Sequence, residues 1–324
     1  MDFGKLHNIS KVNFSMPDEP IENEIVLKSD KWQLASDKLE LTTNHLPLTS
    51  IKNVYIGCTG WYVKEWHGTV YPSKIKTSDY VQYYGKQFNT VELNTTHYRI
   101  PTLEEVRKWR EQTPLDFRFA PKMLQAVSHS KDLGYGTGLT ANFIENILHL
   151  ENKLGITFLQ LPPTFGYHQL KILETYLKKV AHLLPLAIEV RNENLFAQKE
   201  YSDSFFQLLE HYKVSTVITD VSGRRDVLHL RLTTPNVLIR FVGNNLDTSD
   251  YKRVDAWVEK INYWFELGLQ TVYFFSHQPD NIQSPIIARY FYDKLMASMS
   301  GKFKINARCY QPVIEKTDGQ MSLF

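Results

Sequence analysis

The sequence is short of several features that mark common protein classes. Only two cysteines, Cys58 and Cys309, are present, which excludes a disulfide framework and the ligand spacing of a zinc finger. No run of roughly 18 apolar residues occurs, which excludes a membrane-spanning helix. The first residues also lack the apolar stretch of a signal peptide. We therefore expect a protein of the reducing cytoplasm.

An excess of positive charge is also lacking. The chain of 324 residues has 37 basic and 35 acidic residues, a net charge of +2. Proteins that bind nucleic acid nonspecifically usually show a strong basic excess, so any contact with nucleic acid has to come from a local patch. Hydrophobic residues make up 43% and aromatic residues 13%, which excludes disorder of the whole chain.

Short apolar runs recur from residue 54 onward and have the composition of buried strands. They are rich in Val, Ile, Phe and Tyr and are bounded by Gly, Pro, Asn or Asp. The eight runs are 54–58, 90–94, 117–121, 156–161, 186–191, 215–220, 237–242 and 271–276. Segments with helical spacing separate them, such as the apolar stripe from Leu170 to Leu184, and Thr140 is expected to cap another helix.

Strands that alternate with helices predict an α/β fold with a parallel sheet. Eight such units over residues 51–300 have the count and length of a (β/α)₈ TIM barrel. An open doubly wound sheet is the alternative, although no G-x-G-x-x-G follows the first run.

The two ends of the chain differ from this regular part. Residues 1–50 are polar and irregular, with a helix expected within 21–41, and we predict an N-terminal extension that packs on the barrel. Residues 301–324 are predicted to form a flexible tail.

Charged residues interrupt the predicted strands at Glu92, Glu189, Arg191 and Arg240. A buried charge must be paired, because an unpaired one costs several kcal/mol. One interpretation is a structural ion-pair layer, for example Glu189 with Arg240. The other is a polar pocket at the carboxyl ends of the strands, where barrel enzymes have their active sites. In that pocket Glu92 and Glu189 are the acid/base candidates.

Lys122 follows the third predicted strand, and three roles are open for it. It is a Schiff-base nucleophile if its pKa is depressed, an anion ligand, or a solvated loop lysine. Contact with a phosphate or carboxylate is favoured over Schiff-base chemistry. We count Lys122 among the catalytic candidates.

A metal site is a further hypothesis. His97, His129 and His277 offer ligands for zinc or manganese together with Glu92, Glu189 or Asp220. The chain has no H-x-H or H-E-x-x-H spacing, so a divalent metal is not favoured and the cofactor is left unknown.

The candidates for substrate binding are polar and aromatic residues near the predicted strand ends. They are Trp61, Asn94, Tyr98, Arg99, Gln160, Arg191, Asp220, Arg224, Arg240, Asn244 and His277. Arg224 and Arg225 follow Gly223 and predict either an anion-binding loop or a solvated turn. Trp61, Tyr62, Trp66, Tyr71 and Tyr98 would stack on sugars or bases at the rim, and core packing is the alternative.

Several short sequence motifs, in a fixed order along the chain, support the prediction of a barrel with a polar pocket. They include Tyr55–Tyr62, Phe88–Asn94, Tyr98–Pro101, Gln160–Pro163 and Glu189–Arg191. Together they resemble the YecE-like family, a TIM-barrel family whose function is unknown, over about residues 51–300. The resemblance implies a polar pocket at the strand ends. By analogy with the barrels of endonuclease four and the sugar isomerases, it suggests phosphate or sugar chemistry.

Two positions depart from the usual pattern of that family. The seventh strand usually reads Arg-x-His-Gly, but this chain has Val242 in place of the histidine. The eighth strand usually ends in asparagine, but this chain has His277 after Ser276. A different specificity is therefore expected, and compensation by His277 is left open.

The last five residues are Gln320-Met321-Ser322-Leu323-Phe324. They resemble the pentapeptide that binds the bacterial sliding clamp, Gln-Leu-Ser/Asp-Leu-Phe. Leu323 and Phe324 would enter a hydrophobic groove, and Gln320 would fix the register through hydrogen bonds. An apolar end that packs on its own barrel is the alternative.

The leading hypothesis is an enzyme that acts on a phosphate- or sugar-bearing substrate, with DNA at the sliding clamp as one candidate. A non-catalytic adaptor that binds a ligand or nucleic acid is the alternative, and sugar or aldol chemistry through Lys122 is a third. Paired and shielded charges would favour the adaptor, whereas unpaired carboxylates in an open pocket would favour the enzyme.

Overall fold

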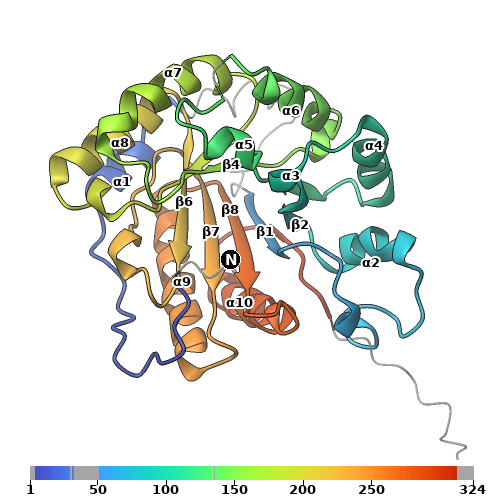
Figure 1. Ribbon diagram of the computed structural model, residues 1–324. Coiled ribbons are helices and arrows are strands. Elements are labelled where there is room, and N and C mark those ends of the chain that lie inside the picture. The colour runs from blue at the N-terminus through green and yellow to red at the C-terminus, as the bar shows by residue number, and fades with distance from the viewer. Residues whose placement is uncertain (1–3, 30, 33–50, 135, 312–324) are drawn as a thin grey trace, which may run out of the picture.

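A computed structural model describes residues 4–29, 31–32, 51–134 and 136–311 (Figure 1). Apart from a single 3₁₀ helix (Arg225–Val227) between the sixth and the seventh, α-helices separate eight strands along the chain. They are β1 (Lys52–Cys58), β2 (Thr90–Leu93), β3 (Arg118–Pro121), β4 (Thr157–Gln160), β5 (Leu186–Glu189), β6 (Ser215–Asp220), β7 (Asn236–Val242) and β8 (Thr271–His277). Each of these strands overlaps one of the eight predicted runs, and their ladders are parallel. The expected α/β fold with a mostly parallel sheet is confirmed.

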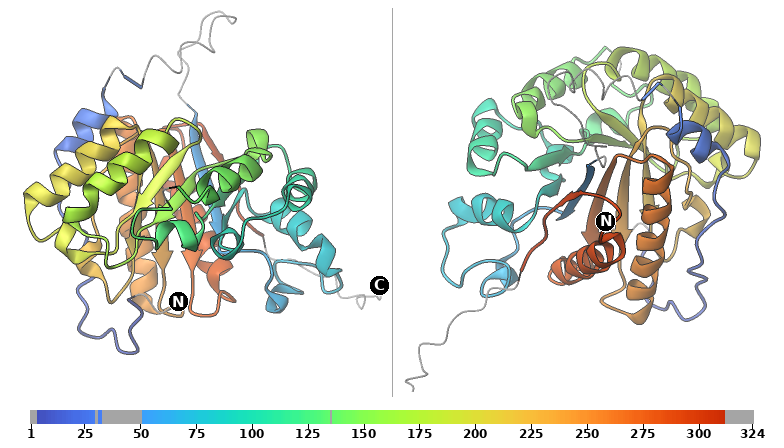
Figure 2. Two further views of the ribbon diagram at one scale, coloured as in Figure 1. Left: turned by 45° about the horizontal axis from the view of Figure 1, so that its top comes forward. Right: turned by 180° about the vertical axis from the view of Figure 1, so that it is seen from behind.

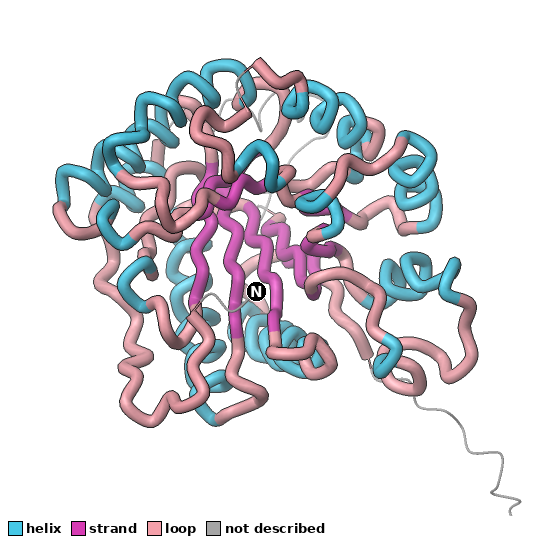
Figure 3. Tube along the Cα trace, viewed as in Figure 1, coloured by secondary structure: helices cyan, strands magenta, loops and turns pink. Residues whose placement is uncertain are grey.

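Helices surround the strands on the outside (Figure 3). The longer ones are α2 (Tyr80–Gln87), α4 (Leu103–Gln112), α6 (Leu139–Leu148), α7 (Leu170–Val180), α8 (Lys199–His211), α9 (Thr248–Leu267) and α10 (Ser284–Met299), and the short ones are α3 (Thr95–Tyr98) and α5 (Gln125–Ser128). The predicted stripe buries Leu173, Leu177 and Val180 of α7. Thr140 does not cap a helix, because α6 already begins at Leu139, after Gly138 with its left-handed φ of 73°. No helix in the described part is long and apolar enough to cross a membrane.

The hydrogen-bonded sheet has the order β4-β5-β6-β7-β8-β1-β9, in which β9 is the short strand Ile305–Ala307, and β2 and β3 form a separate pair. A side chain links the two sheets at β1. Asn89 accepts from the amide of Ile56 at 2.7 Å and donates to the carbonyl of Val54 at 2.9 Å. At the other seam, single bridges such as that between Lys122 and Phe158 connect the chain after β3 to β4.

The sequence predicts a flexible tail after Ser300, but residues 301–311 include an ordered strand and buried side chains. β9 (Ile305–Ala307) pairs in parallel with β1. Cys309 and Tyr310 are buried beyond it and belong to the main core. These apolar residues tie the segment down as far as residue 311.

The described N-terminal residues lie against the outside of the molecule. α1 (Glu22–Leu27) lies beside α8, as both views in Figure 2 show. Asn23 donates to the carbonyl of Leu230 and accepts from the amide of Leu232, each at 2.7 Å. Glu19 accepts from the indole of Trp264 at 2.9 Å. The rest of the predicted helix within 21–41 falls largely outside the described residues.

Candidate functional site

An ion-pair network joins three strands at their carboxyl ends. Arg240 of β7 donates through Nε and Nη2 to both oxygens of Glu92 on β2, each at 2.9 Å. Its Nη1 donates to Glu189 of β5 at 2.8 Å, which confirms the predicted pair. The other oxygen of Glu189 accepts from Nε of Arg191 at 2.9 Å. Both carboxylates are fully buried, with 0% of their surface exposed.

Polar neighbours extend this network. Glu92 also accepts from Nδ2 of Asn94 at 3.0 Å and lies 2.9 Å from Nε2 of His277. Because an ionised carboxylate can only accept, Nε2 of His277 carries the proton. Beside the network, the Nζ of Lys122 donates to Oε1 of Gln160 at 2.9 Å.

The arginines keep both glutamates ionised. Burial alone would raise the pKa of Glu92, but Arg240 and His277 outweigh it and hold that pKa well below its ordinary value. For Glu189 burial acts in the same direction, yet Arg191 and Arg240 lower its pKa to about 2. At neutral pH neither carboxyl has a proton to donate, and protonation of either would weaken its ion pair with an arginine.

For Lys122, burial outweighs the attraction of the nearby carboxylates, and its pKa shifts toward the neutral form. Burial, followed by the charge of Arg240, lowers its pKa to about 8, although Glu189 and Glu92 act against the shift. Roughly one tenth of the amine is therefore neutral at pH 7. Burial also lowers the pKa of His277 despite the adjacent Glu92.

A cavity of about 250 Å³ lies over this network, and we call it the strand-end cavity. It is lined by Lys5, Thr59, Asn94, Tyr98, Lys122, Arg191, Thr219, Arg240, Val242, His277, Gln278, Pro279 and Asn281. The lining thus includes four cationic side chains, whereas Glu92 and Glu189 are not part of it. The carboxylates lie behind the arginines, so the cavity presents positive charge to an incoming molecule.

The structure brings together nine of the predicted site residues. Asn94, Tyr98, Lys122, Arg191, Arg240 and His277 line the cavity, while Glu92, Glu189 and Gln160 contact these lining residues from behind. Trp61, Arg99, Asp220, Arg224 and Asn244 are not among the lining residues, and each has another set of contacts.

The predicted anion-binding loop is engaged internally. Arg224 pairs with Asp226 at 2.9 Å and donates to the carbonyl of Arg191 at 3.0 Å. Arg225 pairs with the buried Asp220, which also accepts from Arg253 at 3.1 Å. These guanidiniums neutralise carboxylates of their own region, in a turn that stays partly exposed.

Three other predicted site residues, Trp61, Arg99 and Asn244, also lie outside the lining and contact neighbouring side chains instead. Trp61 is only 4% exposed and packs edge-on against Trp109, so it is core and not rim. Trp66 and Tyr71 are likewise buried, whereas Tyr98 is 67% exposed. The guanidinium of Arg99 pairs with Glu105, and the amide groups of Asn244 bond to Asp250.

The hypothetical metal ligands do not converge. His277 contacts Glu92, while the ring centroids of His97 and His129 lie 5.7 Å from each other. Nδ1 of His97 donates to the carbonyl of Met123 at 2.7 Å, and burial lowers the pKa of His97 to about 4. Within the described ranges, no group of three or more His, Cys, Asp or Glu side chains could hold a metal ion.

Some lining residues were not predicted from the sequence. Thr219 precedes the predicted Asp220 and is the register partner of Arg240. Because successive side chains of a strand point to opposite faces, the alternation with Asp220 could have identified it. Lys5 has no such signal, because it lies far before the first strand.

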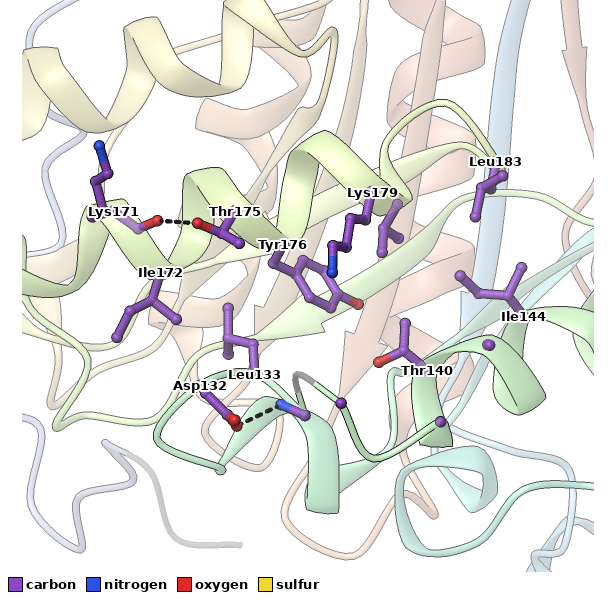
Figure 4. Close-up of a pocket in the computed structure, with 15 residues that line it drawn as sticks. Asp132, Leu133, Thr140, Ile144, Lys171, Ile172, Thr175, Tyr176, Lys179 and Leu183 are labelled. Carbon is purple, nitrogen blue, oxygen red and sulfur yellow. Dashed lines mark hydrogen bonds between the residues drawn. The ribbon is translucent and has the colours of Figure 1, made fainter.

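A larger cavity of about 450 Å³ lies between α6 and α7 (Figure 4). Ile144, Ile172, Val180 and Leu183 contribute to its lining, which is mainly apolar. Its one carboxylate, Asp132, accepts from the backbone amide of Gly134 at 3.1 Å. Its polar groups, such as Lys171, Thr175 and Tyr176, stand in a mainly apolar lining, whereas an ion-pair network lies against the other cavity. We therefore place the candidate site at the strand ends.

Comparison with solved structures shows relatives of the same fold. A DUF72 family protein of Thermotoga maritima (TM1631) is 25% identical, with a TM-score of 0.59 over 75% of this chain and 98% of its own. A DUF72 family protein of Enterococcus faecalis (EF0366) is 21% identical, with a TM-score of 0.58 over 76% of this chain and 98% of its own.

Sequence comparison gives the family. The UPF0759 protein YecE of Escherichia coli K12 is 30% identical over 264 residues, covering 76% of this chain and 94% of YecE. The UPF0759 protein YunF of Bacillus subtilis is 30% identical over 207 residues, covering 59% of this chain and 71% of YunF. The model of the family described as "Protein of unknown function DUF72" matches residues 55–308. Since that match spans the strands and the network at their ends, this chain belongs to the DUF72 family.

Proposed function

We propose that the strand-end cavity binds the anionic group of a small phosphate-bearing molecule. One observation carries the proposal: Lys122, Arg191 and Arg240 line the cavity while both glutamates lie behind them. The glutamates orient the two guanidiniums, and oriented guanidiniums suit phosphate oxygens. Carboxylates that are paired and shielded also favour ligand binding over carboxylate catalysis.

The size of the cavity and its neutral lining groups limit the kinds of molecule that could bind there. Its volume of about 250 Å³ lies below the roughly 300–1,000 Å³ of typical ligand pockets. Thr59, Asn94 and Gln278 add hydroxyl and amide groups to the lining. These groups suit the hydroxyls of a short polar skeleton, so a sugar phosphate is the favoured ligand. A DNA strand would enter only by its terminal phosphate.

The proposal treats the eight strands as a (β/α)₈ barrel, the architecture in which ligands bind at the carboxyl ends of the strands. The side chain of Asn89 at the seam between β1 and β2 supports this view, because it takes the place of ladder hydrogen bonds there.

Calorimetric titration with a hexose monophosphate tests the proposal. We expect Lys122→Met and Arg191→Met to weaken binding at least about tenfold, because each removes a charge-assisted hydrogen bond. Lys171→Met is the matched control, since it removes the same charge at the apolar cavity. Equal losses in all three variants, or no binding by the unaltered chain, would overturn the proposal.

Imine chemistry at Lys122 is a second candidate, favoured by the pKa of about 8 of its amine. A neutral amine attacks a carbonyl carbon, and loss of water leaves an imine. An enzyme of this kind would rely on Lys122 and not on the two locked glutamates. Borohydride would trap a substrate aldehyde or ketone on Lys122 as a secondary amine, and mass spectrometry of Lys122→Met should show no such adduct.

We also propose that the C-terminal pentapeptide binds the bacterial sliding clamp. Gln320, Leu323 and Phe324 lie outside the described residues, so the proposal rests on the sequence pattern alone. Clamp binding would place the protein in the bacterial cytoplasm, close to DNA that is being replicated or repaired. In that setting the phosphate-bearing ligand would be a DNA end.

A further inference from the structure

The N-terminal segment contributes a cation to the strand-end cavity. Lys5 lines the cavity, and its ammonium donates to the carbonyl of Pro279 at 3.4 Å. Pro279 follows β8, whereas Arg191 follows β5, and β6 and β7 separate these strands in the sheet. The ammonium of Lys5 therefore lies at the β8 wall of the cavity, whereas Arg191 lies at the β5 wall.

A close backbone contact fixes the position of Lys5. The amide of Gly223, in the loop after β6, donates to the carbonyl of Gly4 at 2.6 Å. A Cβ atom on Gly223 would lie 2.5 Å from that same carbonyl oxygen, and one on Gly4 would lie 2.7 Å from Cγ of Arg224. Gly4 also has a left-handed φ of +67°. Both positions require glycine, so this contact is specific to the two segments that make it.

A second anchor holds the segment ten residues further on. The ring of Phe14 lies 5.6 Å from the guanidinium of Arg225 and 5.0 Å from that of Arg253. Arg225 also donates to the carbonyl of Ser15 at 2.9 Å. Lys5 thus belongs to a segment that is attached to the loop after β6 at two points.

We infer that Lys5 is a ligand-binding residue and that it holds a second anionic group of the ligand. The inference rests on the proposed function. An ammonium has three donors, and Pro279 accepts from only one of them over a long distance. With Lys122, Arg191 and Arg240 around one anionic group and Lys5 at another wall, the cavity suits a ligand with two such groups, as in a sugar bisphosphate. Lys5 lies outside the matched residues 55–308, so this preference comes from a part of the chain that the family model does not include.

The test compares two ligands on matched variants of the full chain. Calorimetry measures the dissociation constants of a hexose monophosphate and a hexose bisphosphate. We expect Lys5→Ala to weaken binding of the bisphosphate about tenfold and that of the monophosphate less than about twofold. Lys5→Arg should retain most of the affinity because it retains the charge. Lys11→Ala is the control, since Lys11 is exposed on the same segment and does not line the cavity.

The possible results separate this inference from the proposed function. If Lys5→Ala affects both ligands equally or neither, Lys5 holds no second anionic group, and the strand-end site is retained. If the unaltered chain prefers the monophosphate, the inference is likewise wrong. If the unaltered chain binds neither ligand, the inference and the proposed function both fail.

Discussion

Glu189 contacts two guanidiniums at once, Arg191 through one oxygen and Arg240 through the other. Two buried positive charges would repel each other without it. The carboxylate therefore holds both arginines where they line the strand-end cavity. Its role in our proposal is to position these arginines, and it does not require contact with the ligand.

Replacing Glu189 by glutamine tests this role. Glu189→Gln removes the negative charge that Arg191 and Arg240 share, while Arg240 retains Glu92. We expect the free energy of unfolding in urea to fall by about 3 kcal/mol, because two buried ion pairs lose their common carboxylate. Glu266→Gln serves as the control, since Glu266 pairs with Lys302 at 3.0 Å on the surface and should lose less than about 1 kcal/mol. Similar losses in the two variants would show that the buried ion pairs of Glu189 stabilise the fold no more than an exposed ion pair does.

From the pKa of Lys122 we predict how anion binding changes with pH. Its pKa is about 8, so the positive charge is lost as the pH rises through that value. Sulfate is the suitable probe, because its own charge is constant from about pH 6 to about pH 10. We expect its affinity to be highest below pH 8 and to fall above it. The fall should be centred near pH 8, the pKa of the amine in the unliganded protein.

Calorimetric titrations across this range provide the measurement. Lys122→Met should bind sulfate more weakly and should lose this fall in affinity. A Lys122→Met variant that retains the full pH dependence would assign it to another group.

His277 shows what the sequence alone leaves open. Proteins of the YecE-like family, which the sequence resembles, usually have a histidine at the position of Val242. In this chain the imidazole is that of His277, on the next strand. Val242 and His277 are register partners and both line the strand-end cavity. The register between two strands depends on the packing of the whole sheet, so spacing along the chain could not show that the two positions are neighbours.

At the scale of elements, Asn89 joins β1 to β2 where no ladder does. It is only 1% exposed, and its amide satisfies one donor and one acceptor of β1. Asn89→Ala would remove two buried hydrogen bonds, to the amide of Ile56 and the carbonyl of Val54. We expect a loss of about 2–4 kcal/mol in the free energy of unfolding, measured in urea.

Asn262→Ala is the matched control for this seam. Asn262 donates to Ser298 at 2.9 Å on the surface, so its replacement should change stability by less than about 0.5 kcal/mol. If Asn89→Ala is equally mild, water or a backbone shift replaces the amide and the seam does not depend on it.

The elements themselves were largely predictable. A strand that is buried on both faces is a continuous apolar run, and this local signal located β1 to β8. β9 was missed because it has only three residues and none of them is fully buried. The contribution of Asn89 was missed because a side chain that replaces a ladder leaves no periodic signal.

For the whole molecule, the net charge of +2 does not reveal that four cationic side chains line the strand-end cavity. The convergence of Glu92, Lys122, Glu189, Arg191 and Arg240 followed from the rule that the carboxyl ends of parallel strands meet. Which of these charges faces the cavity did not follow, because it depends on how the side chains pack. The same limit explains Lys5, which reaches the cavity only through the fold of a distant segment.

The sliding clamp provides the last prediction, which also belongs to the whole molecule. A chain without residues 320–324 should bind the bacterial clamp at least about 100-fold more weakly than the full chain in calorimetric titrations, because it lacks both apolar anchors. Lys316→Ala, outside the pentapeptide, and Arg191→Met, in the strand-end cavity, should bind the clamp like the full chain. If the truncated chain binds equally well, the link to DNA is lost. If it instead loses stability in urea, the apolar end packs on the folded part of its own chain, and only a small molecule is left as the phosphate-bearing ligand.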